Sequence, residues 1–169
     1  MDAKGKVVVG VDGSQASVDA LRWALEEARR RDAEVHVVTA WHTDPPPVEG
    51  PPPVVGMPYH AAEEALTAQQ AQQDQAMACV AGEAQGMTVY RHMVSQWPPR
   101  ALVHLSTGAD LLVLGRQGHS WVAEKLLGSV SAYCLRHARC PVVVVPARKP
   151  VQQERPNPVV VQAAPEPLY

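Results

Sequence analysis

Four short apolar runs are the feature of this chain that most restricts its fold. They span residues 6–11, 35–40, 111–114 and 142–145, and valine or leucine fills most of their positions. Each run is too short to form a stable helix, and such runs are typical of strands buried on both faces. Longer segments with helical patterning separate them. This alternation predicts an α/β domain with a parallel sheet.

The first run begins a strand–helix–strand unit. It ends at Asp12-Gly13-Ser14, a turn signal in which Ser14 can serve as a helix N-cap. Apolar residues then recur at helical spacing, with charged residues on the other face: Val18, Leu21, Ala24, Leu25 and Ala28. A strand, a helix of about 16 residues and a second strand predict parallel pairing with a right-handed crossover.

The middle of the chain predicts a loop, a long helix and a third strand. Residues 44–58 are dense in proline, which favours a loop with polyproline II character. Residues 61–85 are rich in Ala, Gln and Glu, so we expect a surface helix there. Its narrow buried stripe would consist of Leu66, Met77 and Val80. The more polar residues 88–94 predict a strand at the edge of the sheet.

The last third predicts two helices around the fourth strand. Pro98 and Pro99 suit the entrance of a short helix whose apolar side is Ala101, Leu102 and Leu105. Residues 130–139 form a plausible final helix before the strand at 142–145.

A glycine-rich connection follows the fourth strand and carries the clearest functional signal. Gly115, Gly118 and Gly128 have the spacing G-x2-G-x9-G-[ST]. Without a Cβ, the backbone can approach phosphate oxygens closely. Ser129 and Ser131 fall at the start of the final helix, where unpaired N–H groups and the helix dipole favour an anion. Their hydroxyls can cap the helix or donate to a phosphate. The alternative is a turn punctuated by glycines, with serine caps.

This spacing resembles the nucleotide-binding loop of the universal stress protein family, in its ATP-binding form. Other motifs of the resemblance occur in the same order: Val9 to Ser14, Ala109 to Leu111, Gly128 to Ser131, and Cys140-Pro141 followed by four valines and Pro146. Together they cover roughly residues 5–147.

The resemblance implies a three-layer α/β/α fold with a five-stranded parallel sheet in the order 3-2-1-4-5. In such a Rossmann-like sheet, ligands bind outside the carboxyl ends of the strands where the order reverses. It further implies Asp12 near the ribose and a metal ion, and Ala40 beside the adenine base. The residues expected around the phosphates are Gly115, Arg116, Gly118, Gly128, Ser129, Val130 and Ser131.

The implied ligand is ATP with Mg²⁺ or Mn²⁺, because a carboxylate facing a triphosphate is repulsive unless a cation intervenes. Asp12 could instead cap the first helix. The resemblance also suggests a homodimer through the last strand, Pro141 to Pro146. A strand edge left open there would be an aggregation liability.

Several other classes of function lack their signatures. Neither a P-loop lysine motif, nor G-x-G-x-x-G after the first strand, nor a G-x-S-x-G elbow occurs. The net charge of −2 argues against an extended nucleic-acid-binding face. Cys134, His137 and Cys140 lack a fourth zinc ligand nearby, which favours packing roles. Fast phosphoryl transfer needs a base and cationic stabilisation with no clear candidates here, so we expect slow hydrolysis at most.

The 169 residues predict one domain, residues 1–147, and a proline-rich disordered tail, residues 148–169. We expect no signal peptide and no membrane partner, because the apolar runs are too short. Three cysteines without a CxxC motif favour a reducing cytoplasm. The leading expectation is a cytoplasmic ATP-binding protein of stress response or regulation. The alternatives are a homodimeric interaction module that binds no nucleotide and a weak metal-dependent ATPase.

Overall fold

The computed structural model describes residues 4–41, 59–116 and 127–147. In chain order the elements are β1 (Lys6–Gly10), α1 (Gln15–Arg31), β2 (Glu34–Trp41), α2 (Tyr59–Ala78), α3 (Ala81–Ala84), β3 (Val89–Ser95), α4 (Pro98–Leu105), β4 (Leu111–Gly115), α5 (Ser129–His137) and β5 (Val142–Val145). The loop expected at 44–58 and the tail at 148–169 lie outside the described residues.

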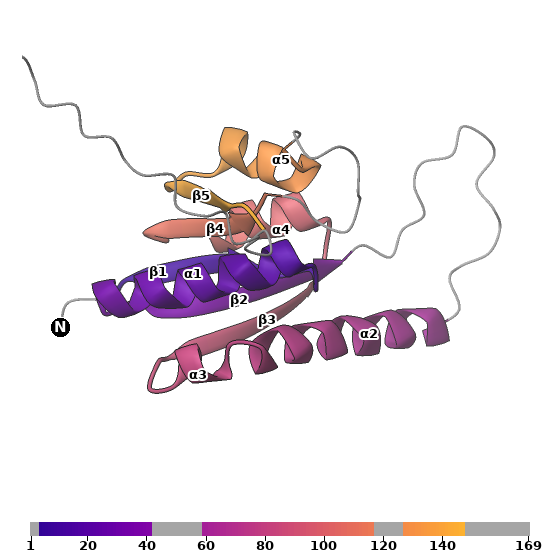
Figure 1. The fold of residues 1–169 in the computed structure, drawn as a ribbon. Coiled ribbons are helices and arrows are strands. Elements are labelled where there is room, and N and C mark those ends of the chain that lie inside the picture. The colour runs from indigo at the N-terminus through magenta and orange to yellow at the C-terminus, as the bar shows by residue number, and fades with distance from the viewer. Residues whose placement is uncertain (1–3, 42–58, 117–126, 148–169) are drawn as a thin grey trace, which may run out of the picture.

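The five strands form one parallel sheet in the order β3-β2-β1-β4-β5 (Figure 1). This is the order that the resemblance implied, and β3 lies at an edge as its polar sequence predicted. The centre of the sheet is β1, where Val8 is in register with His36 of β2 and Leu112 of β4. Because β2 and β4 flank β1, the strand order reverses there, and a crevice is expected at the carboxyl ends.

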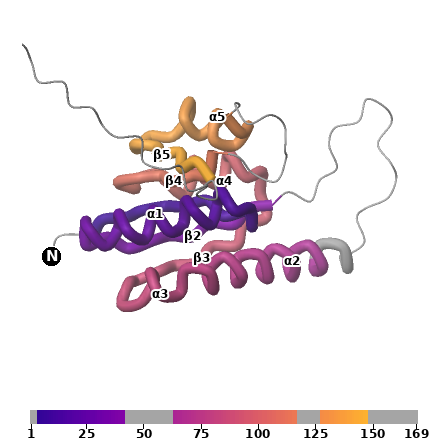
Figure 2. Tube along the Cα trace, viewed as in Figure 1, coloured from indigo at the N-terminus to yellow at the C-terminus, as the bar shows by residue number. Residues whose placement is uncertain are grey.

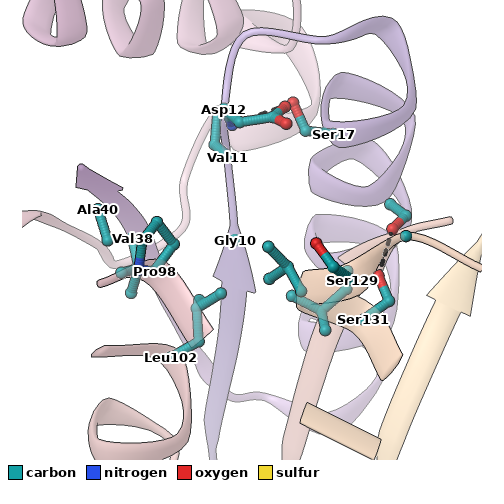
Figure 3. Close-up of a pocket in the computed structure, with 14 residues that line it drawn as sticks. Gly10, Val11, Asp12, Ser17, Val38, Ala40, Pro98, Leu102, Ser129 and Ser131 are labelled. Atoms are coloured by element: carbon teal, nitrogen blue, oxygen red, sulfur yellow. Dashed lines mark hydrogen bonds between the residues drawn. The ribbon is translucent and has the colours of Figure 1, made fainter. Parts of the chain in front are cut away.

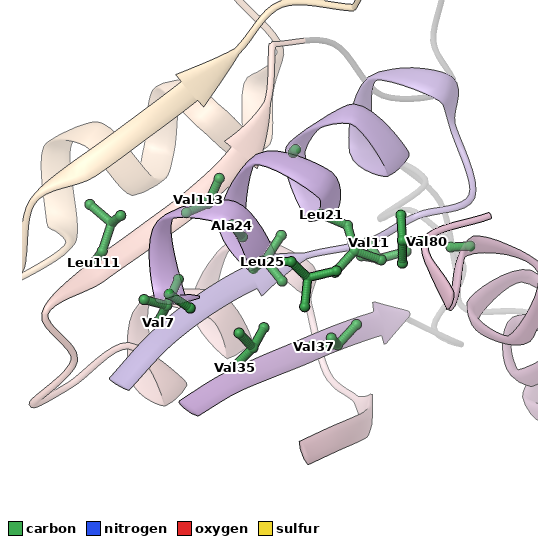
Figure 4. Close-up of a cluster of buried hydrophobic side chains, with 14 of the residues drawn as sticks. Val7, Val11, Leu21, Ala24, Leu25, Val35, Val37, Val80, Leu111 and Val113 are labelled. Carbon is green, nitrogen blue, oxygen red and sulfur yellow. The ribbon is translucent and has the colours of Figure 1, made fainter. Parts of the chain in front are cut away.

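Helices cover both faces of the sheet. The ribbon and the tube view show α1 and α2 in front of the strands, with α4 and α5 on the other side (Figures 1 and 2). Side chains of a strand point alternately to its two faces, so β1 contributes to two cores. Val7 packs with Leu21 and Leu25 of α1 (Figure 4), and Val9 belongs to the same cluster. Val8 packs in the other cluster, which includes residues of α4 and α5.

The first helix follows its sequence pattern closely. Ser14 is the N-cap, and its side-chain oxygen accepts a 3.2 Å hydrogen bond from the Ser17 N–H. The apolar stripe is buried as predicted, with Leu21, Ala24 and Leu25 fully inaccessible to solvent. Local signals therefore suffice to define both the start and the buried face of α1.

The expectation of one continuous helix over residues 61–85 is wrong. The chain forms α2 and the short α3 instead, with Val80 between them at φ −123°. Val80 is fully buried in the core beneath α1, so the helix is interrupted where this side chain enters the core. Leu66, expected in the buried stripe, is only partly buried, whereas Gln73 is buried.

Gln73 is buried because its amide group has partners on two strands. Its Nε2 donates to Thr39 Oγ1 of β2 at 3.0 Å, and its Oε1 accepts from Arg91 Nε of β3 at 2.8 Å. These bonds fasten α2 to the sheet. Within the described part of the chain, no helix is both long enough and apolar enough to cross a bilayer.

Candidate functional site

A cavity of about 370 Å³ opens at the carboxyl ends of the central strands (Figure 3). Its walls come from the ends of β1, β2 and β4 and from the starts of α1, α4 and α5. The lining residues are Gly10, Val11, Asp12, Ser17, Val38, Ala40, Pro98, Leu102, Leu114, Gly115, Gly128, Ser129, Val130 and Ser131. Its volume falls in the range of about 300–1,000 Å³ that is usual for small-molecule sites.

One side of the cavity is apolar. Val38 and Ala40 of β2 face Pro98 and Leu102 of α4 in this region (Figure 3). The floor stays open because β1 has a glycine there: a Cβ on Gly10 would lie 3.1 Å from the Leu102 Cδ2. This side suits a flat apolar group such as an aromatic ring.

The opposite side is polar and begins with the turn after β1. The Asp12 carboxylate accepts through Oδ1 from the Ser14 N–H at 3.0 Å and from the Ser14 hydroxyl at 2.6 Å. The Asp12 N–H donates to Ser17 Oγ at 3.3 Å. Gly13 provides the left-handed conformation that this turn requires, with φ +83°. Asp12 therefore holds the N-cap residue of α1 in place, while Ser14 itself is the cap.

The start of α5 completes the polar side. Gly128 occupies the N-cap position without a side-chain cap bond. The first amides of an α-helix have no carbonyl partner within the helix, and the positive end of the dipole lies there. In α5 these amides belong to Ser129, Val130 and Ser131, all of which line the cavity. This end of the cavity therefore favours an anionic group.

The two serines have different surroundings. Ser129 is exposed, whereas Ser131 is buried and its hydroxyl donates to the Gly115 carbonyl at 2.8 Å. The Ser131 hydroxyl, which the sequence predicted to cap the helix or to donate to a phosphate, thus donates to β4 instead and holds α5 against that strand. Ser131 remains available to a ligand through its backbone N–H and the hydroxyl lone pairs.

The ends of the glycine-rich connection are fastened together. The Gly128 N–H donates to the Arg116 carbonyl at 2.9 Å, and the Arg116 N–H donates to the Val145 carbonyl of β5 at 2.8 Å. Gly115 makes room for α1, because a Cβ there would lie 2.8 Å from the backbone carbon of Ala16. The close packing of α1 against β4 thus requires glycine at position 115, which the motif alone did not indicate.

Seven of the nine residues expected at a ligand site line this cavity: Asp12, Ala40, Gly115, Gly128, Ser129, Val130 and Ser131. Arg116 is not among the described lining residues, and Gly118 lies outside the described part of the chain. The sequence motifs missed the apolar side formed by Val38, Pro98 and Leu102, because those residues carry no motif.

A resident metal site is not formed by protein groups alone within the described ranges, since no three His, Cys, Asp or Glu side chains gather around one point. Mg²⁺ is commonly held by one or two carboxylates together with substrate phosphates. Asp12 fits that arrangement as the carboxylate at the polar end of the cavity.

A histidine pair that sequence spacing did not indicate lies on β2 and β3. His36 Nδ1 and His92 Nε2 are 2.9 Å apart, and His36 Nε2 lies 3.0 Å from Glu34 Oε1. Burial lowers the pKa of His92, and the neighbouring His36 lowers it further. The two histidines lie on different strands, so only strand pairing could bring them together.

Comparisons with known proteins agree on one family. The model of the universal stress protein family matches residues 4–146. A universal stress protein of Mycolicibacterium smegmatis is 34% identical over 141 residues, which cover 82% of this chain and 47% of that protein. The chain therefore spans about half the length of this curated relative.

Two solved structures share the fold. A universal stress protein crystallised in complex with cAMP is 29% identical, with a TM-score of 0.58 over 87% of this chain and all (100%) of that one. A protein from the universal stress protein family of Burkholderia pseudomallei is 26% identical, with a TM-score of 0.61 over 87% of this chain and 99% of that one. Because the family model covers nearly all of the described residues, the chain belongs to the universal stress protein family.

Proposed function

We propose that this chain is a cytoplasmic regulatory protein of the stress response that binds ATP, with Mg²⁺ or Mn²⁺, in the cavity at the carboxyl ends of β1 and β4. The observation that carries the proposal is the division of that cavity into an apolar side and a polar side that includes a helix N-terminus. An adenine nucleotide has the same division, with a flat base at one end and phosphates at the other.

In this proposal the adenine base lies between Ala40 of β2 and the α4 residues Pro98 and Leu102. The phosphates accept hydrogen bonds from the amides at the start of α5, beside Gly128 and Ser129. Asp12 lies near the ribose and the divalent cation. Several charge-assisted bonds, offset by desolvation and ordering, correspond to an affinity near micromolar, or about −8 kcal/mol.

The solved structure of a relative in complex with cAMP supports the class of ligand, because its sequence is 29% identical to this chain over 87% of its length. We infer an adenine nucleotide from that likeness together with the shape and polarity of the cavity. ATP is preferred over AMP in the proposal because the amides of α5 and the carboxylate of Asp12 together suit a polyphosphate with its cation.

The proposed activity is binding, with slow hydrolysis at most. The residues proposed to surround the phosphates offer backbone amides and hydroxyls, and Asp12 is proposed as a cation ligand. Rapid phosphoryl transfer also needs a group that positions the attacking water. A metal-dependent turnover that Asp12→Asn removes while ATP binding persists would favour the weak ATPase instead.

Isothermal titration calorimetry with Mg²⁺-ATP tests the proposal directly. Gly128 has φ −59°, a conformation open to any residue, so Gly128→Val should fold and place a side chain where the phosphates bind. We expect binding to be lost. Gly82→Val is the matched control, because Gly82 is exposed and a Cβ there meets no atom within 4 Å. Equal affinity of Gly128→Val and the parent protein would contradict the phosphate site.

We also propose that the protein forms a homodimer through β5. This strand is an edge of the sheet, and its four valines, Val142–Val145, are all only partly buried in the single chain. Pairing of two β5 edges would cover these valines and satisfy the outward backbone groups of the strand. The homodimer is also the form expected if the chain acted only as an interaction module.

A further inference from the structure

A second cavity, of about 280 Å³, lies between α4 and α5. It shares no lining residue with the cavity proposed to bind the nucleotide, which we call the nucleotide cleft. Its lining residues are Arg100, Val103, His104, Thr107, Tyr133 and Arg139. Helix α4 separates the two cavities, because Pro98 and Leu102 line the nucleotide cleft while Arg100 and His104 line this one. We refer to these six residues as the α4–α5 groove.

The groove is rich in cationic side chains. Arg100 and His104 are one turn apart on α4, and Arg139 follows α5. The lining contains no carboxylate, and within the described residues none of these three side chains has an ion pair. A pocket that gathers two guanidinium groups without a counter-charge attracts an anion.

The arginines of α1 and β3 show the contrast. Arg22 lies 2.8 Å from a Glu83 oxygen, Arg31 lies 2.7 Å from Glu27, and Arg91 lies 2.5 Å from Asp74. Arg30 likewise pairs with Glu27. Carboxylates of the same chain therefore neutralise these four guanidinium groups. Arg100 and Arg139 have no such partner among the described residues. Arg29 and Arg136 also lack a carboxylate partner there, and their guanidinium groups donate to backbone carbonyls. The α4–α5 groove differs in that two such guanidinium groups line one cavity.

The remaining walls are well ordered by contacts within the protein. The Tyr133 ring packs edge-on against Trp97 at a centroid distance of 4.9 Å, and it lies tilted against His137 at 4.2 Å. Thr107 is held by its hydroxyl, which donates to the Val103 carbonyl at 3.4 Å. The carbonyls of Leu102 and His104 accept from the amides of Ser106 and Thr107, so the negative end of α4 is largely satisfied within the chain.

We propose that the α4–α5 groove binds the phosphate or diphosphate group of a small anionic molecule. The guanidinium forks of Arg100 and Arg139 can each donate two hydrogen bonds to one phosphate, and His104 adds a further donor. The cavity volume accommodates a diphosphate between them. The proposal is argued only from the residues of the α4–α5 groove, and it does not depend on nucleotide binding in the cleft.

Inorganic pyrophosphate is the probe for this site. We titrate it into the ¹⁵N-labelled full chain at low ionic strength and follow the amide signals. Saturable shifts are expected at Val103, Thr107 and Tyr133. The double variant Arg100→Gln/Arg139→Gln should weaken binding by about tenfold or more for each arginine removed, since hydrogen bonds to charged groups are lost. Inorganic phosphate, titrated in parallel, shows whether one phosphoryl group suffices.

The control variant is Arg30→Gln/Arg31→Gln, which removes the same charge from the exposed end of α1. It should bind pyrophosphate as the parent protein does. The proposal is overturned if no saturable shift occurs, if both double variants weaken binding equally, or if the shifts centre on Ser129 to Ser131. The last outcome would mean that pyrophosphate binds only in the nucleotide cleft. All four substitutions are at exposed positions, so the fold should be retained.

Discussion

The Ser131 hydroxyl donates a 2.8 Å hydrogen bond to the backbone carbonyl of Gly115. This bond joins the first turn of α5 to the end of β4, although the two residues are 16 positions apart in the chain. The same turn carries the amides proposed to bind phosphate. The position of the proposed phosphate end of the cleft therefore depends on a contact between a helix and a strand.

Replacing Ser131 should cost stability, whereas replacing Ser129 should not. Ser131→Ala leaves the Gly115 carbonyl without its partner, and we expect the free energy of unfolding to fall by about 1–2 kcal/mol. Ser129 is exposed, so Ser129→Ala should change the free energy of unfolding by less than about 0.5 kcal/mol. Urea unfolding of both variants measures the difference. Equal losses of unfolding free energy in the two variants would show that the hydrogen bond of the Ser131 hydroxyl does not stabilise the fold.

Two glycines of the cleft should respond differently to alanine. A Cβ on Gly115 would meet backbone atoms of Ala16 at 2.8 and 2.9 Å, so Gly115→Ala must displace α1. We expect a loss of about 1–3 kcal/mol of stability. A Cβ on Gly10 would meet only the ends of the Leu102 and Leu114 side chains, which can rotate.

Gly10→Ala should therefore fold well but reduce the space for the proposed base. We expect its affinity for ATP to fall about tenfold, equivalent to about 1.4 kcal/mol. Thermal unfolding and calorimetry on both variants separate the two effects. Retention of full affinity in Gly10→Ala would place the base elsewhere.

A proline in β5 tests the proposed homodimer. The Pro141 carbonyl accepts from Leu112 of β4, and the Val145 carbonyl accepts from Arg116, the residue after β4. By alternation the backbone groups of Val144 therefore point away from β4. Val144→Pro removes an outward donor at an edge, where proline is tolerated. Sedimentation velocity should show the parent protein as a dimer and Val144→Pro as a monomer, with Val144→Ala remaining dimeric. A parent protein that is monomeric at micromolar concentration would contradict the dimer.

Ionisation of the Cys134 thiol should lower the free energy of unfolding at alkaline pH. Burial raises the pKa of the Cys134 thiol from its ordinary value of 9.0 to about 11, with a smaller contribution from Cys140. Between these values the unfolded chain loses the proton first, so the stabilisation present below pH 9 is lost as the pH rises toward 11.

The measurement is urea unfolding at pH 8 and pH 10.5 for the parent protein and for Cys134→Ala. The parent should lose about 2 kcal/mol more than the variant over this interval. Titrations of lysine and tyrosine side chains occur in both proteins and cancel. Identical losses would mean that the Cys134 thiol ionises in the folded protein as readily as in the unfolded chain.

Local patterns in the sequence predicted much of this structure. The apolar runs became the strands, and the run at residues 142–145 coincides with β5. Ser14 caps α1 because an N-cap bond joins residues only three positions apart. The spacing of Gly115 and Gly128 led to the cleft, since the family resemblance implied the strand order that places β1 beside β4. These features depend on periodicity or on near neighbours, which a sequence displays directly.

Contacts between distant segments were decided only by the tertiary structure. The break at Val80, the burial of Gln73 and the pairing of His36 with His92 all depend on neighbours from other elements. The same holds for the unpaired charges of Arg100 and Arg139, which differ from Arg22 of α1 in that no carboxylate lies beside them. By itself the sequence determined where the strands and most of the helices form, and it predicted where phosphates could bind. The folded chain decided which polar groups are satisfied, because hydrogen bonds and ion pairs act over a few ångströms whatever the separation along the chain.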